Sequence, residues 1–181
     1  QAEQALAKVA AQPPPDDRSA PLAGRQSLVL AAGTGRRAIQ NLLAKTPPLT
    51  TGASISLQLH IVDDTHVNFQ LAKDVVAGLT ASYVGFEKGR ILAYHPGGFS
   101  EFQAGSYDLT KERRFRIAFA FDRELDRCLL TIATLPDNRL IVDKTPIALN
   151  GWNPAQLPNQ GISFDARTGS LAAIDELRVS G

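Results

Sequence analysis

The chain has 181 residues, of which 44% are hydrophobic and 20% charged, a composition typical of a folded globular domain and not of a disordered chain. Its 19 basic and 18 acidic residues leave a net charge of +1, which gives no general attraction to nucleic acid or to an anionic membrane. A single cysteine excludes an intrachain disulfide and a thiolate metal cluster. No apolar run approaches the roughly 20 residues of a membrane-spanning helix.

The first 50 residues precede the clearest strands. Residues 1–24 combine good helix formers with three consecutive prolines, so we expect a linker or tail there. In residues 25–50, Ile39, Leu42 and Leu43 lie at helical spacing before a Pro-Pro pair. This spacing predicts a helical N-terminal extension packed on the domain that follows, and the apolar run just before it fits a short strand or helix.

From residue 51 onward the pattern becomes that of antiparallel strands. In Ser54-Ile55-Ser56-Leu57-Gln58-Leu59-His60-Ile61 apolar and polar residues alternate strictly, which predicts a half-buried strand. The alternation recurs in Phe115-Arg116-Ile117-Ala118-Phe119-Ala120-Phe121, and Glu87-Lys88-Gly89 predicts a hairpin turn in which glycine takes the positive φ. Many short strands separated by polar turns predict an all-β antiparallel β-sandwich over residues 51–181.

Three segments of this region resemble strands of a known family, in the same order. Ile174-Asp175-Glu176-Leu177-Arg178-Val179 resembles the closing strand of laminin-G-like domains within the concanavalin A-like lectin/glucanase superfamily. Tyr83-Val84-Gly85-Phe86-Glu87-Lys88-Gly89-Arg90-Ile91-Leu92-Ala93-Tyr94 and Arg113-Arg114-Phe115-Arg116-Ile117 resemble earlier strands. The resemblance implies a jelly roll for residues 51–181. It implies no single activity, because this fold hosts lectins, glycanases, adhesion modules and silent spacers.

No set of acidic residues fits a glycanase site. Retaining glycanases hold two carboxylates about 5–5.5 Å apart, and the Glu-x-Asp-x-x-Glu motif of the related glycanases is absent. The nearest sets are Asp122, Glu124 and Asp126 in a predicted turn, and the adjacent Asp175 and Glu176, whose side chains point to opposite faces of a strand. We therefore name no catalytic residue. The sequence leaves open whether the chain is an enzyme, and the missing carboxylate pair favours a protein that is not one.

Calcium is the metal that loops of this fold suit best, because it takes carboxylate and carbonyl oxygens. The turn at Asp63 and Asp64 could supply them, and so could Asp175, whose strand parity with Leu171 and Leu177 predicts that it points partly inward. A buried carboxylate needs a cation or several hydrogen-bond donors. For Asp175 we favour an arginine or backbone N–H groups over calcium, and we expect no other cofactor.

Two histidines flank the Asp63–Asp64 turn. His60 and His66 could approach a shared metal across a hairpin, but two imidazoles without a placed carboxylate make a poor zinc site. An exposed polar strand face is the alternative. The one cysteine, Cys128, lies in a strand-like run, which predicts a buried and inert thiol.

A sugar site on this fold would use aromatic rings as stacking platforms, with polar side chains around them. The main candidates are Trp152, Tyr94 and Tyr107, followed by Phe99 and Tyr83. Trp152 stands in a turn-rich segment where strand packing does not need a tryptophan. It fits a ligand contact there, or a cover over one end of the sandwich.

These patterns favour a non-catalytic carbohydrate- or glycoprotein-binding module of a larger exported bacterial protein. The expected partners are a polysaccharide or glycoprotein and other domains of the same polypeptide, without nucleic acid and without a membrane span. The alternatives are a structural or protein-interaction domain without a ligand, which the proline-rich N-terminal segment supports, and a glycan-active hydrolase. A chain that starts at Gln1 fits a mature exported product, periplasmic or at the cell surface, and equally an arbitrary boundary.

Overall fold

The chain forms two layers of antiparallel strands. The computed structural model describes residues 8–10, 27–31, 38–42, 52–63, 66–74, 79–122, 127–151, 161–166 and 170–180. Among these residues there is no helix long and apolar enough to cross a membrane. The regular elements are the strands β1 (Lys8–Ala10), β2 (Ser27–Ala31), β3 (Ala38–Leu42), β4 (Ser54–Asp63), β5 (Val67–Asp74), β6 (Leu79–Glu87), β7 (Arg90–Tyr94), β8 (Glu101–Ser106), β9 (Arg114–Asp122), β10 (Arg127–Thr134), β11 (Leu140–Ala148), β12 (Gly161–Ala166) and β13 (Leu171–Ser180).

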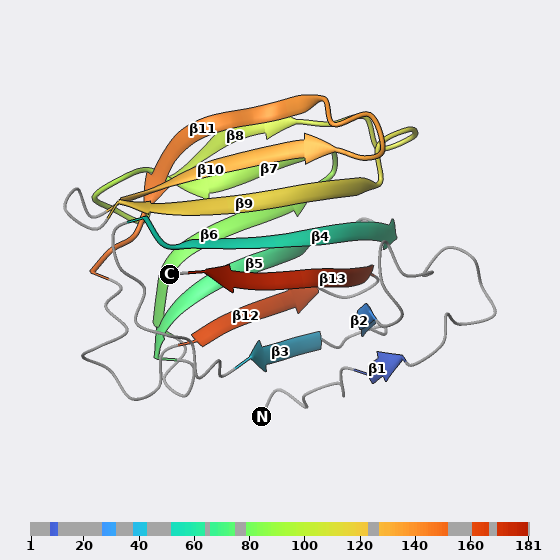
Figure 1. Ribbon diagram of the computed structural model, residues 1–181, viewed down its shortest axis with the longest axis horizontal. Helices are drawn as coiled ribbons and strands as arrows, with labels where there is room; N and C mark the ends of the chain where they lie inside the picture. Colours follow the sequence, from blue (N-terminus) through green and yellow to red (C-terminus); the bar gives the residue numbers. More distant parts are fainter. Residues whose placement is uncertain are drawn as a thin grey trace.

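The strands are divided between a seven-stranded and a six-stranded sheet. The seven-stranded sheet has the order β1-β2-β13-β4-β9-β10-β11, and the six-stranded sheet has the order β3-β12-β5-β6-β7-β8. Figure 1 shows β4, β9, β10 and β13 of the first sheet in front of β5, β6 and β7 of the second. The all-β sandwich predicted from the sequence is therefore confirmed.

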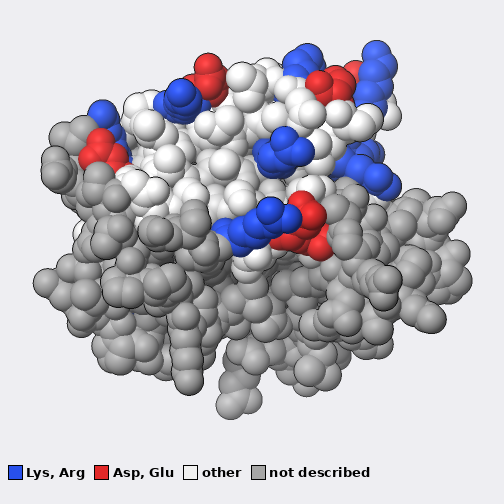
Figure 2. Space-filling view, in the orientation of Figure 1, with Lys and Arg blue, Asp and Glu red and all other residues white. Residues whose placement is uncertain are grey.

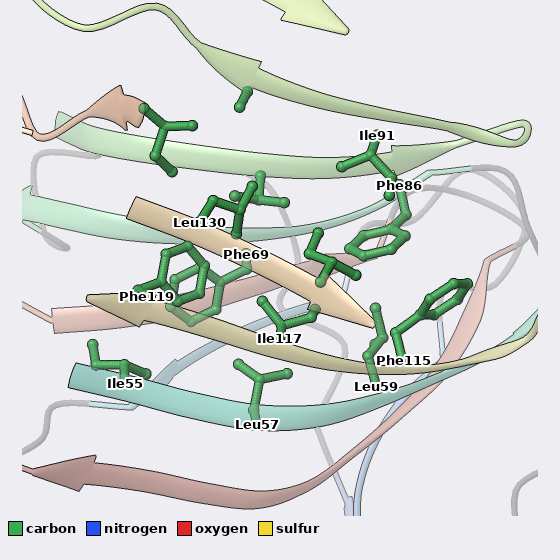
Figure 3. Close-up of a cluster of buried hydrophobic side chains, with 14 of the residues drawn as sticks. Ile55, Leu57, Leu59, Phe69, Phe86, Ile91, Phe115, Ile117, Phe119 and Leu130 are labelled. Carbon is green, nitrogen blue, oxygen red and sulfur yellow. The ribbon is translucent and has the colours of Figure 1, made fainter. Parts of the chain in front are cut away.

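Alternation along the strands builds the core between the two sheets. Ile55, Leu57 and Leu59 of β4 are at most 3% exposed, whereas the intervening Ser56 and Gln58 are partly exposed. Figure 3 shows the apolar side chains of both sheets meeting in one cluster. Across the layers, Phe69 of β5 stacks on Phe119 of β9, with 4.6 Å between ring centroids. Each large apolar side chain buried in this way stabilises the fold by about 1.5–3 kcal/mol.

The predicted hairpin between β6 and β7 is present and depends on its turn residues. Lys88 and Gly89 have φ values of 49° and 82°, the left-handed pair of a two-residue turn whose twist matches that of the strands. A Cβ on Gly89 would lie 3.0 Å from the Tyr107 backbone oxygen, so glycine also allows a close backbone approach.

Cys128 is fully buried in β10, and burial raises the pKa of its thiol to about 12, in line with the predicted inert thiol.

The helix expected within residues 25–50 is wrong for the part that the structure describes. Ser27–Ala31 and Ala38–Leu42 are strands, which pair with β13 and β12 respectively. A helix of about ten residues is marginal on its own, whereas the open edge of β12 supplies a row of hydrogen-bonding partners. Within the predicted tail, Lys8–Ala10 forms β1 and pairs with β2. The division of the chain at residues 24 and 50 stays a prediction.

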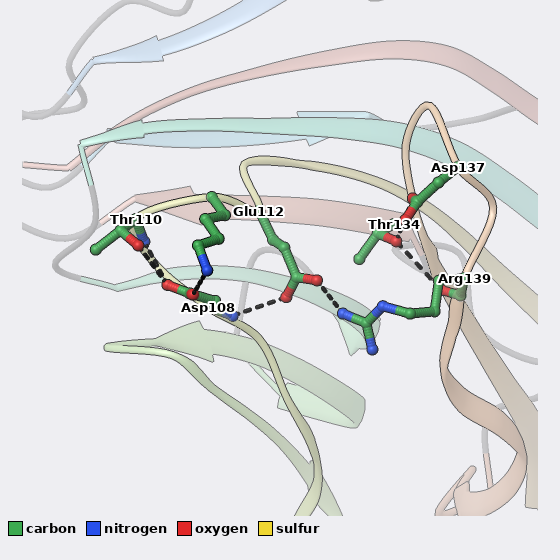
Figure 4. Close-up of polar contacts among 7 residues, drawn as sticks. Asp108, Thr110, Glu112, Thr134, Asp137 and Arg139 are labelled. Atoms are coloured by element: carbon green, nitrogen blue, oxygen red, sulfur yellow. Dashed lines mark hydrogen bonds and ion pairs between the residues drawn. The ribbon is translucent and has the colours of Figure 1, made fainter.

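One end of the seven-stranded sheet is tied by a set of polar contacts (Figure 4). Glu112 accepts a hydrogen bond from the backbone N–H of Asp108 at 2.7 Å and pairs with Arg139 in the β10–β11 turn. Hydrogen bonds from Thr110 lower the pKa of Asp108, and one from Thr134 lowers the pKa of Asp137. These carboxylates serve to hold the loops together.

Candidate functional site

The face of the six-stranded sheet that points away from the core carries polar and aromatic side chains. Val67, Phe69 and Leu71 of β5 are buried in the core cluster, so the alternate residues Asn68 and Gln70 belong to the outer face. The strand register extends this outer face across the sheet. Asn68 lies opposite Asp165 of β12 and Gly85 of β6, and Gln70 lies opposite Tyr83 of β6.

Gly85 gives the Tyr83 ring its place on this face. A Cβ at position 85 would overlap the Tyr83 hydroxyl group and would lie 3.2 Å from Nε2 of His66. The ring of Tyr83 therefore crosses over the Gly85 backbone, and its hydroxyl oxygen lies 2.9 Å from Nε2 of His66. Only the residue without a side chain permits this arrangement.

A chain of hydrogen bonds continues from this pair along β5. Nδ2 of Asn68 lies 3.4 Å from Nε2 of His66, and Gln70 donates to Oδ1 of Asn68 at 3.0 Å. Thr80 in turn donates to Oε1 of Gln70 at 2.9 Å. Because each amide is held by its neighbour, the polar groups have fixed orientations before any ligand arrives.

Ser170 holds the backbone of His66 at the buried end of this chain. The His66 backbone N–H donates to Oγ of Ser170 at 2.9 Å, and the Ser170 hydroxyl donates to the His66 carbonyl at 3.1 Å. Both residues are buried. The segment before β5 is thus fixed to the start of β13.

Aromatic rings lead from this buried end to the surface. Tyr94 of β7 stacks on Tyr83, with centroids 5.1 Å apart and an interplanar angle of 30°. Phe99 meets Tyr94 edge to face at 5.7 Å and is 60% exposed. Burial and then the charge of Glu101 raise the pKa of Tyr94, so its hydroxyl stays protonated and can donate a hydrogen bond. The exposed Phe99 ring and the partly exposed Tyr94 ring are suited to stacking on a sugar ring. The Tyr83, His66 and Asn68 side chains are buried and hold this face in position behind those rings.

The aromatic residues expected to bind a ligand have different positions. Tyr94, Tyr83 and Phe99 come together in the series just described, in which Tyr83 is 5% exposed and supports the more exposed rings of Tyr94 and Phe99. Tyr107 is 7% exposed and packs in the core against Phe86 and Phe115, so the protein itself covers its ring. Trp152 lies outside the described residues.

The expected metal ligands do not form a described cation site. No group of three or more His, Cys, Asp or Glu residues that could hold a metal occurs in the described part of the chain. Asp64 and the side chain of Asp63 lie outside that part, so calcium at this turn stays a prediction. His60 lies on β4 in the seven-stranded sheet, whereas His66 immediately precedes β5 of the six-stranded sheet, so the two do not face each other across a hairpin.

Asp175 has a different orientation from the one expected. Ile174 lies opposite core-facing Leu59, and Asp175 lies opposite outward-facing Gln58, so the predicted inward orientation is wrong. The parity argument failed because a register shift follows Asp175 in β13. Asp175 as a whole is 8% exposed, and its Oδ1 accepts the backbone N–H of Glu176 at 2.7 Å, the kind of partner favoured over a cation.

The polar half of the candidate site was missed in the sequence. Nothing there singled out Asn68, Gln70 or Gly85, and His66 was considered only as a metal ligand. The alternation of residues 66–71 carried the signal, because it places His66, Asn68 and Gln70 on one face. Their proximity to Tyr83 and Tyr94 depends on the pairing of β5, β6 and β7.

Solved structures share this fold at low sequence identity. A legume lectin-like domain from Entamoeba histolytica aligns with a TM-score of 0.56 and 11% identity, covering 88% of this chain and 85% of its own. Lectin I-B4 from Griffonia simplicifolia aligns with a TM-score of 0.52 and 9% identity, covering 85% and 87%. A xylan beta-1,4-xylosidase from Bacillus halodurans aligns with a TM-score of 0.58 and 10% sequence identity. The match covers 86% of this chain but only 33% of the xylosidase.

No protein-family model matches the chain, and no curated protein matches it. These three structural neighbours are at most 11% identical to the chain, and they show that it shares their jelly-roll β-sandwich fold.

Proposed function

We propose that the chain is a non-catalytic module that binds a neutral carbohydrate, free or on a glycoprotein, on the outer face of its six-stranded sheet. The observation that carries the proposal is the continuous series from exposed Phe99 through Tyr94 to the fixed Tyr83–His66 pair. Lectins among the structural neighbours support the ligand class.

The absence of an acid–base pair among the described residues of this face argues for binding without hydrolysis. Glycosidases need two carboxylic groups on either side of the scissile bond. The described acidic residues of this face are spread across the sheet: Asp165 is 2% exposed on β12, Glu87 pairs with Arg90 at the β6–β7 turn, and Glu101 is exposed on β8 opposite Tyr94. Three strands, β5, β6 and β7, separate β12 from β8.

The proposal includes the setting of the module within a larger exported bacterial protein, periplasmic or at the cell surface. The larger size is supported by the xylosidase, of whose chain the match to this fold covers only 33%, and the exported setting rests on the expectation from the sequence. Fractionation of the source cells, followed by immunoblotting for the size and compartment of the full polypeptide, tests this part. A cytosolic protein of this size alone would contradict it.

The binding proposal is tested by titrating a panel of neutral oligosaccharides, among them xylohexaose, cellohexaose and N-acetyllactosamine, into the protein in a calorimeter. We expect at least one of them to bind, and Tyr94→Ala or Phe99→Ala to weaken that binding at least tenfold. Leu140→Ala is the matched control, because it removes an exposed apolar side chain from β11 in the other sheet. Binding by none of the panel, or equal affinities for Phe99→Ala and Leu140→Ala, would overturn the proposal in favour of a structural or protein-interaction domain.

A further inference from the structure

The seven-stranded sheet has a separate polar hollow on its own outer face. It has a volume of about 280 Å³, close to the lower end of the range of small-molecule sites. It lies over β13, β4 and β9, and its lining consists of Ser56, Leu57, Gln58, Arg116, Glu176 and Arg178. Because β4 belongs to one sheet and β5 to the other, the core separates this hollow from the Tyr83–Tyr94 face.

The strand register and a β-bulge bring these side chains together. Gln58 lies opposite Arg116 on β9, and Ser56 lies opposite Arg178 on β13. Between Asp175 and Arg178 the register shifts, and Glu176 takes a left-handed φ of 48°. Bulges of this kind re-aim a side chain, and strained residues of this kind cluster at functional sites.

The bulge points the Glu176 carboxylate at the other residues of the hollow. Gln58 donates to its Oε2 at 2.7 Å, and Nη2 of Arg178 lies 3.5 Å from its Oε1. The carboxylate is therefore fixed in place. It still presents acceptor capacity, because a carboxylate can accept about four hydrogen bonds.

The residues that line the hollow carry two positive charges and one negative charge, and the buried Asp175 carboxylate lies beside them on the same outer face. Of the two guanidinium groups, that of Arg116 belongs to an exposed residue, and the Arg116 side chain makes no ion pair or hydrogen bond with any residue that the structure describes. Figure 2, in which the front surface is that of the seven-stranded sheet, shows basic side chains beside an acidic patch at the lower edge of the described surface.

The mixture of groups defines the chemistry of a ligand. A guanidinium binds a carboxylate through two parallel hydrogen bonds. A ligand with carboxylates alone would be repelled by Glu176, whereas a ligand that also carries hydroxyl groups can donate them to that carboxylate. Sugar acids have both kinds of group on one ring, and isolated acidic side chains of a peptide do not.

We propose that the hollow bounded by Arg116, Arg178 and Glu176 binds a uronate residue, with the carboxylate on Arg116 and ring hydroxyls on Glu176 and Gln58. The site shares the carbohydrate class with the proposed function but lies on the opposite sheet, and so it does not depend on that function being correct. The uronate can come from the free sugar acid or from an acidic polysaccharide.

The test uses three probes in calorimetric titrations of the whole chain: galacturonate, trigalacturonate and the methyl ester of trigalacturonate. We expect the protein to bind at least one of the two acids, and the ester, which keeps the ring hydroxyls, to bind at least tenfold more weakly than trigalacturonate. Tighter binding of trigalacturonate than of galacturonate identifies a polysaccharide as the source, and equal binding identifies the free sugar acid.

Arg116→Ala should weaken acid binding at least tenfold without affecting folding, because this side chain has no partner among the described residues. Arg90→Ala is the matched control, an exposed arginine on β7 of the other sheet, and should change acid binding less than twofold. Equal losses in the two variants, equal binding of acid and ester, or no binding of either acid would overturn the inference. Phe99→Ala should leave acid binding unchanged, and Arg116→Ala should leave neutral oligosaccharide binding unchanged, so that each proposal fails on its own result.

Discussion

Gly85 is the residue on which the geometry of the candidate sugar site depends most. The Tyr83 ring occupies the space that a side chain at position 85 would fill, and this position brings its hydroxyl to His66 and its ring face to Tyr94. Position 85 requires glycine because a side chain would not fit beside the Tyr83 ring. The backbone conformation does not require glycine, since φ of Gly85 is not in the left-handed region. A single missing Cβ thus determines how three side chains meet.

We predict that Gly85→Ala displaces the Tyr83 ring and weakens binding of the neutral ligand at least tenfold. The loss of stability should be about 1–3 kcal/mol, as is usual for an overpacked site. Denaturant unfolding and titration measure the two effects. Tyr83→Phe is the control: it removes only the hydroxyl, so about 1 kcal/mol should be lost while the stacking on Tyr94 remains. An unchanged affinity in Gly85→Ala would show that the ring position does not matter for binding.

His60 is a buried histidine whose charge state differs between the folded and unfolded chain. Burial, then the charges of Arg114 and Arg113, lower its pKa from 6.5 to about 4 in the folded protein. Between these values the unfolded chain binds a proton that the folded chain does not. The contribution of His60 to stability is therefore complete above pH 6.5 and decreases as the pH falls to 4.

We predict that His60→Gln reduces the loss of stability between pH 7 and pH 4.5 by about 1–2 kcal/mol, a value that allows for solvent screening of the arginine charges. The measurement is the free energy of unfolding in urea at several pH values. His95→Gln makes the same substitution at an exposed histidine and serves as the matched control. A His60→Gln profile parallel to that of the unaltered protein would contradict the prediction.

At the scale of the elements, β13 is the strand whose regular pairing with its neighbour is interrupted by a bulge. Its register with β4 is interrupted between Asp175 and Arg178, although β13 lies in the middle of the sheet between β2 and β4. Glu176 takes φ 48° at that point, a conformation that is unfavourable for a residue with a Cβ. The bulge is what places a carboxylate in the polar hollow.

We predict an inverted order of stability for Glu176→Gly and Glu176→Ala. Both variants lose the contacts of the carboxylate with Gln58 and Arg178, but only glycine relieves the left-handed strain, so the Gly variant should be the more stable by about 1 kcal/mol. The same pair at exposed Glu101 on β8 is the control and should show the ordinary strand order, with Ala more stable by about 0.5–1 kcal/mol. Urea unfolding measures all four variants. The ordinary order at both positions would rule out strain at the bulge.

At the scale of the whole molecule, the sandwich gives two outer faces of different chemistry. The six-stranded sheet presents aromatic rings and neutral hydrogen-bonding groups, whereas the seven-stranded sheet presents guanidinium groups and a fixed carboxylate. A common core of side chains from both sheets holds these faces in position. Because the core is dense and the strands are paired, the two faces should act as rigid and independent surfaces.

The sequence by itself determined the class of fold. Strict alternation in residues 54–61 and 115–121 fixes which side chains enter the core, because a strand places successive residues on opposite faces. It also determined the Lys88–Gly89 turn and the buried thiol of Cys128, since both depend on local patterns. It named Tyr83, Tyr94 and Phe99 as aromatic candidates but gave no reason to separate them from Tyr107.

Only the tertiary structure decided which of these residues meet. Tyr107 lies in the core, where it packs against Phe86, whereas Tyr94 lies on an outer face, where it stacks on Tyr83. Ala38–Leu42 became a strand because β12 offered an edge, and the bulge in β13 reversed the expected direction of Asp175. The polar hollow joins residues about 60 and 120 positions apart in the chain, Gln58 with Arg116 and Glu176. Such proximity follows from the order of strands in a sheet, a long-range property that local alternation does not encode.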